Sequence, residues 1–468
     1  MQRKEYSMQA TKASLRMTSP EKKEFYRELR ALAIPIGLQS LLTALIGATD
    51  ALMLGRLHQD AVAAVSLANQ IVFIMNLFIG AVLGGGGALI AQYWGKNDRR
   101  MVSNIFCMIS KWSLGISFVF FALAMLAPKL MMRIYTPETA LIEIGADYLR
   151  AVAPSYLFTA VTQCYLVVMK VEGKAGKSVI ISIVTLVLDM VLDLFLIYGL
   201  AGAPKLEANG SAYSTVAVEL IALIWCVLES RRGDSIRLDR EGLRWHSAAV
   251  TKDFIKIALP ALGSSLAWGV GFSMHSMIMG HLGSDATAAA SITSVVQSLV
   301  TCICHGVSAG AGIILGKLLG QDLFDKAKVY GRKLCHLSFW VGGLHMLLFA
   351  IIGPIIAHFF VLSDMARHYL LCMMLFMGVY VVAYSINTIV VCGIFPAGGD
   401  TRYDAVSVLL ASWCFSLPLA LLGTFVLDLP VMVVYILMMA DEIVKLPWIY
   451  PHYKKYIWVK NLTRDENA

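Results

Sequence analysis

Residues 55–66 read GRLHQDAVAAVS, and residues 280–291 read GHLGSDATAAAS. Their Gly, Leu, Asp, Ala and Ser positions coincide when the chain is shifted by 225 positions, and the same shift aligns residues 31–97 with residues 256–322 without a gap. Apolar segments match one another by chance, so the evidence for a repeat comes from the Pro, Gly, Asp and Ser positions. Their recurrence predicts an internal duplication that covers nearly all of the chain. Further coinciding pairs are Ala33 with Ala258, Pro35 with Pro260, Ser40 with Ser265, Gly85 with Gly310, Gly87 with Gly312 and Gly95 with Gly320.

The composition indicates an integral membrane protein. Of 468 residues, 58% are hydrophobic and only 15% are charged, whereas soluble domains are about half apolar and about a quarter charged. Many apolar runs have the ~20 residues that a helix needs to cross the hydrocarbon core. Residues 2–30 are rich in Lys and Arg and contain no apolar core segment, which predicts a cytoplasmic tail and not a signal peptide.

The positive charge has an uneven distribution along the chain. The net charge is +8, but most Lys and Arg lie in the two tails and in the even-numbered loops. The bias predicts that both termini are cytoplasmic, and it explains the charge without nucleic acid. The nine cysteines lie in or beside apolar segments without a CxxC pair or a His cluster, so we expect small core residues and no metal site. The Lys and Arg in odd-numbered loops are Arg56, Lys129, Arg133, Lys205 and Arg367.

The apolar runs predict an all-α membrane protein with twelve transmembrane helices. Six helices per copy is an even number, so the second copy begins on the same side as the first and the two lobes are parallel repeats. We expect a tail at 1–30, a lobe at 31–229, a charged linker at 230–253, a second lobe at 254–450 and a tail at 451–468. The predicted helices are 32–54, 61–93, 104–127, 148–170, 178–199, 211–229, 255–280, 286–317, 333–361, 365–393, 404–424 and 429–450.

Several short motifs resemble those of the multidrug and toxic compound extrusion (MATE) family, in order and at the family's spacing over residues 30–463. The resemblance implies a transporter of two six-helix lobes, not an enzyme, that exports bulky organic compounds in exchange for H⁺ or Na⁺ without another cofactor. It also implies a monomer in the cell membrane of a bacterium, with a small organic molecule and the lipid bilayer as its partners. The motifs are Asp50 to Leu57, Ala68 to Ile71, Ala91 to Gly95, Asp189 to Gly199, Gly210 to Thr215, Gly393 to Arg402 and Trp458 to Thr463.

Carboxylates within the apolar segments are the candidates for ion coupling, because an ionisable side chain at bilayer depth costs at least ~2.5 kcal/mol. Asp189 and Asp193 are four residues apart and share a helical face. Two like charges so close cannot both ionise cheaply, so we expect one of them to be neutral or both to share a cation. The resemblance adds Asp50 to the same cavity, where Ser211, Ser214 and Thr215 can add hydroxyl oxygens to a proton relay or to a hard-cation site. The alternative interpretation is that Asp193 and Asp50 lie near helix ends and are merely solvated. The family usually has Asn in place of Asp189 and Arg in place of Pro396.

The resemblance also implies an apolar and aromatic substrate cavity, which suits organic cations. Its candidates are Tyr165, Trp268, Phe272, His275, Met277 and Tyr384, and for each of them packing or lipid contact is the alternative interpretation. The last helix carries the charged residues Asp441, Glu442 and Lys445, of which Asp441 and Lys445 have the i,i+4 spacing of a structural ion pair. Lys111 stays unassigned, because a lysine near a helix end can extend its ammonium toward the membrane surface.

Other functions fit the sequence less well. A flippase for lipid-linked saccharides, or an exporter of another dedicated lipid or metabolite cargo, would share the fold, but a pyrophosphate cargo calls for several Lys or Arg in the helices and only Lys111 is present. A membrane enzyme would require a catalytic His, Ser, Asp or metal set near one membrane face, and the short loops hold none. A passive channel does not need the carboxylate cluster.

Overall fold

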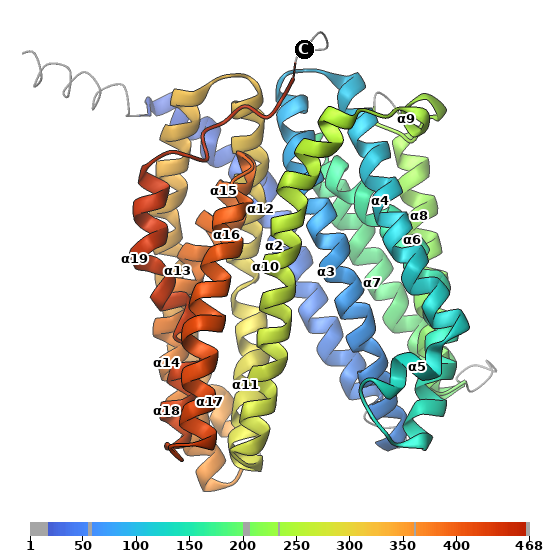
Figure 1. Cartoon of the computed structure of the whole chain (residues 1–468), viewed down its shortest axis with the longest axis vertical. Helices are drawn as coiled ribbons and strands as arrows, with labels where there is room; N and C mark the ends of the chain where they lie inside the picture. The colour runs from blue at the N-terminus through green and yellow to red at the C-terminus, as the bar shows by residue number, and fades with distance from the viewer. Residues whose placement is uncertain (1–16, 55–58, 200–205, 233–234, 360–361, 465–468) are drawn as a thin grey trace, which may run out of the picture. The chain divides into compact units, whose positions relative to one another are not determined.

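The computed structural model describes residues 17–54, 59–199, 206–232, 235–359 and 362–464, whose regular elements are all helices (Figure 1). Two stretches of π-helix, Val390–Ile394 and Leu409–Ser416, interrupt the α-helices. The α-helices are α2 Ser19–Leu54, α3 Gln59–Gly95, α4 Arg99–Leu126, α5 Pro128–Arg133, α6 Thr139–Val171, α7 Ala175–Tyr198, α8 Ala208–Ser230, α9 Arg240–Arg244, α10 Ala248–His281, α11 Ser284–Val300, α12 Cys302–Gly320, α13 Phe324–Phe359, α14 Asp364–Ile389, α15 Phe395–Ala397, α16 Thr401–Val408, α17 Leu417–Phe425, α18 Val431–Met438 and α19 Asp441–Lys454.

Eleven helical stretches within the described residues are long and apolar enough to cross a bilayer. They match the first eleven predicted helices in order. The predicted twelfth helix is divided between α18 and α19, each of which is too short to count by itself. The predicted class, an all-α membrane protein of twelve spans in two parallel repeats, is thereby confirmed.

Several helices begin earlier than their apolar runs. The first, fourth and ninth predicted helices begin at 32, 148 and 333, whereas α2 begins at Ser19, α6 at Thr139 and α13 at Phe324. The added turns are amphipathic: in α2, Phe25 and Leu29 are buried while Arg27, Glu28 and Arg30 are exposed. A search for apolar runs stops where charged residues begin, although the helix and its buried stripe continue.

The helix interruptions have local causes. Each π-helical stretch stands just before a proline, Pro396 in α15 and Pro418 in α17, and proline removes one N–H and crowds the preceding turn. The predicted eighth helix is interrupted at Thr301, whose hydroxyl donates to the Gln297 carbonyl at 2.8 Å. Such a bond to the preceding turn often bends a helix. Between α18 and α19 the non-helical residues are Met439 and Ala440.

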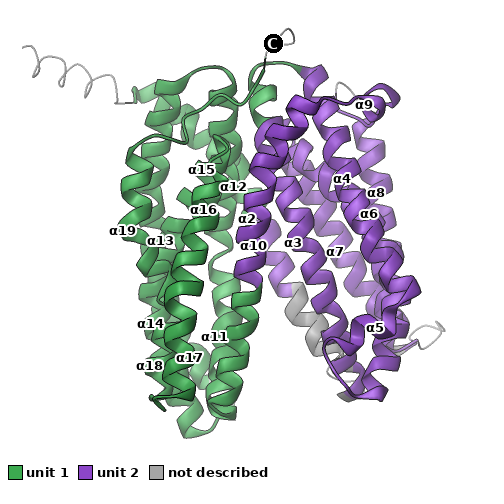
Figure 2. Cartoon of the chain, in the orientation of Figure 1, with its two compact units in different colours: residues 1–37, 91–98, 270–468 green, residues 38–90, 99–269 purple. Residues whose placement is uncertain are grey.

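The chain forms two compact units (Figure 2). Unit 1 contains residues 1–37, 91–98 and 270–468, and unit 2 contains residues 38–90 and 99–269. The beginning of α2 therefore packs with unit 1, and the beginning of α10 packs with unit 2. These units are defined by packing; the lobes at 31–229 and 254–450 are defined by the sequence repeat and stay a prediction.

Glycine contacts reproduce the duplication in three dimensions. In unit 1, a Cβ on Gly95 would overlap the Lys317 carbonyl, and a Cβ on Gly320 would overlap the Gln92 carbonyl. Gly95 and Gly320 occupy the same position of the two copies, and so do Gln92 and Lys317, so each copy makes the same contact with the other. Only glycine permits this approach, because the backbone of the partner helix occupies the space of a side chain.

A second pair of contacts explains the exchanged helix segments. In unit 2, Gly85 of α3 faces Ala258 of α10, and in unit 1, Gly310 of α12 faces Leu32 and Ala33 of α2. Gly85 and Gly310 are equivalent positions, as are Ala33 and Ala258. The first part of the first helix in each copy thus packs against the second helix of the other copy, as an axis along the membrane normal requires.

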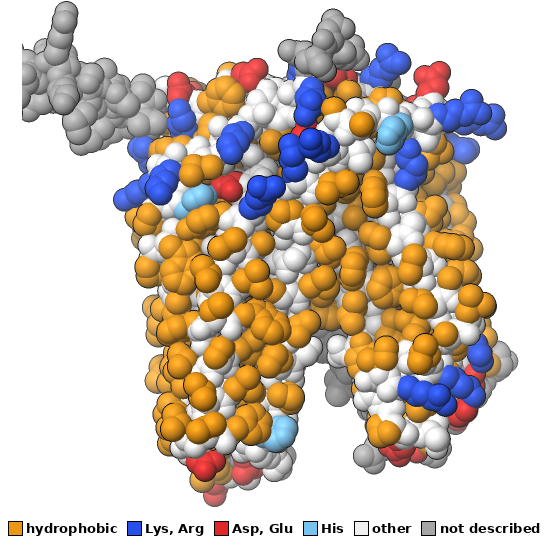
Figure 3. All heavy atoms as spheres, viewed as in Figure 1, with side chains coloured by type: hydrophobic (Ala, Val, Ile, Leu, Met, Phe, Trp, Pro, Cys, Tyr) orange, Lys and Arg blue, Asp and Glu red, His pale blue; other side chains and the backbone are white. Residues whose placement is uncertain are grey.

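Each unit has its own apolar core. The core of unit 2 includes Ile79, Leu149 and Tyr156, and that of unit 1 includes Phe349, Met373 and Met377. On the face drawn in Figure 3, hydrophobic side chains cover the length of the helices, while Lys and Arg gather near helix ends. An apolar outer surface over a separately packed interior is what a bilayer environment demands.

Candidate functional site

Asp193 lies in unit 2, where α7 packs against α8. Its side chain is 3% exposed. The Ser214 hydroxyl donates to Asp193 Oδ1, and the Ser211 hydroxyl donates to Asp193 Oδ2 at 3.4 Å. None of the ion pairs between described residues includes Asp193. A carboxylate in a membrane span is therefore held by hydroxyls alone in this part of the chain.

The hydroxyls come from the first turns of α8. Ser211 and Ser214 are three residues apart, so both face α7. Thr215 donates instead to the Ser211 carbonyl at 3.0 Å, which is a bond within its own helix. The structure thus brings Ser211 and Ser214 to Asp193, while the Thr215 hydroxyl stays on the backbone.

The structure shows the burial of two other carboxylates in these spans but not the side chain of a third. Asp189 is half-buried one turn before Asp193 on α7. Asp50 belongs to α2, but its side chain lies outside the residues that the structure describes. Glu219 of α8 is half-buried. The coupling roles of Asp50, Asp189, Asp193, Ser211 and Thr215 stay a prediction.

The predicted substrate-cavity residues are divided between the units. Tyr165 and Trp268 belong to unit 2, whereas Phe272, His275, Met277 and Tyr384 belong to unit 1. Tyr165 is packed inside its unit and contacts the Phe106 ring edge-on at 4.9 Å, which agrees with the packing interpretation. Trp268, Phe272 and Met277 are 44–50% exposed. The substrate cavity itself stays a prediction.

Unit 1 contains a charged cluster that we name the Lys445 cluster, made of Asn387, Ser412, Asp441, Glu442 and Lys445. Lys445 Nζ lies 2.6 Å from Glu442 Oε1 and 4.0 Å from Asp441 Oδ2. Asn387 donates to Glu442 Oε2 at 2.7 Å, and Ser412 donates to Asp441 Oδ2 at 2.9 Å. All five side chains are buried. The sequence predicted Asp441 as the partner of Lys445, but Glu442, one residue later, is the closer one.

The Lys445 cluster lies where three spans are irregular. Asp441 and Glu442 begin α19 directly after its break from α18, Ser412 belongs to a π-helical stretch, and Asn387 shortly precedes the other. Asn387 Oδ1 and Asp441 Oδ1 are buried without a hydrogen-bond partner in the described part of the chain. Sequence reasoning named the three charged residues but missed Asn387 and Ser412, which come from other helices.

Three of the sequence motifs meet in unit 1. The fully buried Gln92 side chain donates to the carbonyls of Ala397 and Lys460 at 2.7 and 3.1 Å and accepts from the Leu462 N–H at 2.6 Å. Trp458 is also fully buried, and a Cβ on Gly398 would overlap its carbonyl. These motifs therefore fasten the C-terminal segment to α3 and α15, which is a structural role.

The duplicated twelve-span helical fold, with carboxylates buried inside the spans, defines a polytopic membrane protein of the transporter type. The MatE family profile matches residues 35–195 and 260–422, so this chain belongs to the MatE family of membrane transporters.

Individual relatives agree over nearly the whole length. The uncharacterized transporter YisQ of Bacillus subtilis is 22% identical over 455 residues, which are 97% of this chain and 99% of YisQ. The probable multidrug resistance protein YoeA of the same organism is 23% identical, over 97% of this chain and 98% of YoeA.

Solved structures share the fold. A MATE transporter crystallised in the straight conformation superposes with a TM-score of 0.81 at 17% identity, covering 92% of this chain and 96% of that chain. A multidrug resistance MATE transporter of the MOP superfamily, solved in an outward-facing conformation, gives a TM-score of 0.81 at 15% identity, covering 92% and 96%. At these identities the likeness shows the fold alone.

Proposed function

We propose that this protein is a secondary active exporter of organic compounds in which Asp193 takes up H⁺ or Na⁺ as the cargo leaves. The observation that carries the proposal is a buried carboxylate bonded only by hydroxyls among the described residues. The Na⁺ or H⁺ would serve as the exchanged ion, and no cofactor is required.

Because Asp193 is buried without a cationic partner, the stability of its carboxylate depends on whether a proton or a cation is bound to it. An uncompensated buried charge costs several kcal/mol, so the carboxylate is stable in the membrane only when a proton or cation neutralises it. The charged form is stable only where water reaches it. A conformational equilibrium can be shifted by a ligand that binds one state better than the other. Ion binding at Asp193 supplies this differential affinity.

The surrounding oxygens suit the task. Ser211 and Ser214 donate hydrogen bonds to an ionised Asp193, and each hydroxyl also has lone pairs that can turn toward a bound hard cation. Asp189 and Asp50 extend the set on the neighbouring turn of α7 and on α2. In this proposal Asp193 is the centre and the other residues adjust its affinity.

The cargo is proposed to be organic and cationic. Support comes from the relatives, since YoeA is named a probable multidrug resistance protein and MdtK of Yersinia enterocolitica a multidrug resistance protein. The latter is 26% identical over 65% of this chain and 67% of its own length. We propose that the protein is a monomer in the cell membrane. Both termini lie in the cytoplasm in this proposal, because Lys and Arg concentrate in the tails and the even-numbered loops.

The test is efflux of a fluorescent cationic dye from proteoliposomes, under a proton gradient alone and then a sodium gradient alone. Wild type is compared with Asp193→Asn and with Asp147→Asn, a control at an exposed carboxylate of α6. We expect efflux under one gradient in wild type and the control, and none in Asp193→Asn. If Asp193→Asn transports like wild type, Asp193 is not the coupling residue. If inserted wild type moves no dye under either gradient, the cationic cargo is wrong.

A further inference from the structure

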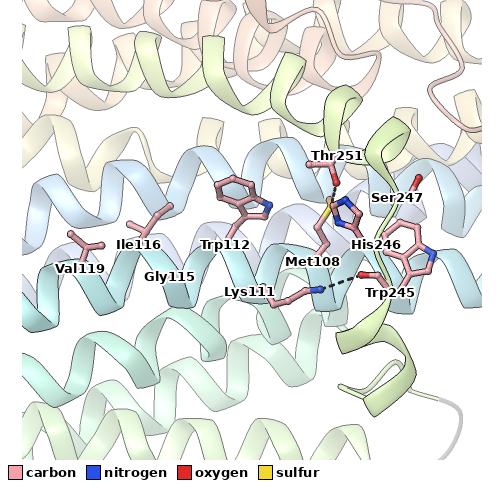
Figure 4. Close-up of a pocket in the computed structure, with 10 residues that line it drawn as sticks. All are labelled: Met108, Lys111, Trp112, Gly115, Ile116, Val119, Trp245, His246, Ser247 and Thr251. Atoms are coloured by element: carbon pink, nitrogen blue, oxygen red, sulfur yellow. Dashed lines mark hydrogen bonds between the residues drawn. The ribbon is translucent and has the colours of Figure 1, made fainter.

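A groove on unit 2 is not used by the proposed transport function. It has a volume of about 470 Å³ and lies between α4, the segment 245–247 and the first turn of α10 (Figure 4). This volume falls within the range of small-molecule sites, about 300–1,000 Å³. Lys111 is the only Lys or Arg among the ten described residues that line the groove, and none of the ten is Asp or Glu. The groove therefore does not suit the cationic cargo proposed above.

The Lys111 ammonium is fixed at one end of the groove. Its Nζ donates to the Leu243 carbonyl at 3.0 Å and to the Trp245 carbonyl at 3.3 Å, and Figure 4 shows the side chain directed toward this segment. The two bonds use two of the three donors of an ammonium, and the third is available to an anion. Ser247 and Thr251 add hydroxyls to the same end. The charge of Lys111 is thus positioned instead of being free to extend into water.

The other end of the groove is apolar and follows α4 into the membrane span. Gly115, Ile116 and Val119 form this wall, and the wall is open, because Val119 is 55% exposed and a Cβ on Gly115 would contact nothing within 4 Å. Further along the same helix, Leu123 and Leu126 are also exposed. The groove therefore passes from a fixed positive charge to a surface that hydrocarbon chains cover.

Two tryptophans lie where the polar end of the groove meets its apolar end. Trp112 of α4 is 44% exposed, and Trp245 contributes one of the carbonyls that Lys111 binds. Tryptophan is enriched at the membrane–water interface, where one side of the ring meets headgroups and the other meets acyl chains. The linker that forms this end of the groove is rich in Arg, which attracts anionic lipid to the same surface. The Arg residues are Arg231, Arg232, Arg237, Arg240 and Arg244.

We propose that this groove binds an anionic phospholipid from the leaflet that the 230–253 linker faces. The headgroup phosphate accepts the third N–H of Lys111, the glycerol end lies between Trp112 and Trp245, and one acyl chain follows Gly115, Ile116 and Val119. The lipid bridges α4 and the beginning of α10, two helices from different copies of the repeat within unit 2.

The first test is lipid retention by native mass spectrometry, after full-length protein is released from nanodiscs that contain equal amounts of phosphatidylglycerol and phosphatidylethanolamine. Wild type should retain phosphatidylglycerol selectively. Lys111→Met should lower its retention about fivefold, the effect of one lysine at an anionic surface. Lys252→Met, an exposed lysine outside the groove, should not lower it. Equal retention of both lipids by wild type, or equal losses in the two variants, would overturn the proposal.

A second variant tests the apolar end without removing charge. Gly115→Leu places a side chain in open space and should reduce retention of phosphatidylglycerol while the protein stays folded. Gly343→Leu on α13 also enters open space and is the matched control. Folding is checked for every variant by size-exclusion chromatography and thermal unfolding. Folded Gly115→Leu that retains as much lipid as Gly343→Leu shows that the chain does not follow this wall.

Discussion

Two clusters of buried carboxylates differ in how their charge is compensated. In unit 2, Asp193 is bonded by Ser211 and Ser214, and no described Lys or Arg forms an ion pair with it. In unit 1, Glu442 and Asp441 surround Lys445, whose ammonium lies 2.6 Å from Glu442. The residues at the two sites do not occupy equivalent positions of the repeat. The two copies therefore carry their buried acids at different positions of a common scaffold.

This difference suits the Asp193 site to binding and releasing an ion, and it suits the Lys445 cluster to stabilising the fold. A carboxylate held by hydroxyls can take up a proton or a cation and release it again, because no tethered cation competes for it. In the Lys445 cluster the competing cation is part of the chain, and removing it would leave two acids without compensation.

Lys445→Met should have the largest effect, and the effect should be on folding. Removing one partner of a buried ion pair costs about 3–5 kcal/mol, because the other charge is left uncompensated. The melting temperature of the purified protein should fall strongly, and adding Glu442→Gln should restore part of it. Lys256→Met removes an exposed ion pair with Asp253 and should change little. Equal melting temperatures for the two single variants would contradict a structural role of the Lys445 cluster.

Asp193→Asn should show the opposite pattern, with transport lost and stability kept. Without a group that binds the driving ion, the gradient cannot shift the conformational equilibrium, so efflux should fall to the level of proteoliposomes without protein. The Asn side chain has nearly the same shape and can still accept a hydrogen bond from Ser214, so melting should change little. Initial efflux rates and melting curves from the same preparation separate the two effects. A variant that unfolds would show that Asp193 is mainly structural.

Ser214→Ala should destabilise the protein moderately. A hydrogen bond typically contributes about 0.5–1.5 kcal/mol to stability, and its loss leaves Asp193 with the 3.4 Å bond from Ser211. Ser211→Ala is the matched comparison, because that bond is 3.4 Å long and its removal should affect melting less. If the two variants are equally stable, Ser214 is not the main partner of Asp193.

Asp189→Asn should have the smallest effect. Asp189 is half-buried, and Asn has nearly the same shape, so the change in stability should not exceed the roughly 1 kcal/mol that is typical of point substitutions. We expect dye efflux within about twofold of wild type. A loss as large as that of Asp193→Asn would show that both carboxylates take part in coupling.

The architecture could be predicted from the sequence because the repeat includes glycine positions that no other residue type can occupy. Gly95 and Gly320 cannot carry a side chain where two backbones meet, so their spacing identifies the duplication without an alignment. The π-helical stretches also have a signal, since each precedes a proline, at Pro396 or Pro418. The break between α18 and α19 has no Pro or Gly at Met439 and Ala440, so no comparable sequence signal marks it.

The candidate site was only partly predictable, because the sequence indicates which helix ends adjoin but not which other side chains meet. Ser211 and Ser214 could be assigned to Asp193 because consecutive antiparallel helices bring their adjoining ends together. Ser412 comes from the middle of the preceding span and Asn387 from the span before that, and no local pattern reveals contacts made away from the adjoining helix ends. The groove at Lys111 likewise depends on the backbone path of the linker, which composition alone does not determine.

The exchanged ends of α2 and α10 have a consequence for biogenesis. Ala33 cannot meet Gly310 until the ribosome has added about 280 further residues, which takes roughly 14–55 s at about 5–20 residues per second. During this interval the beginning of the first span has no permanent neighbour, although the chain is already inserting. The second half, by contrast, emerges when Gly85 is already in place to receive Ala258. Assembly of the two halves is therefore asymmetric in time even though their contacts are symmetric in space.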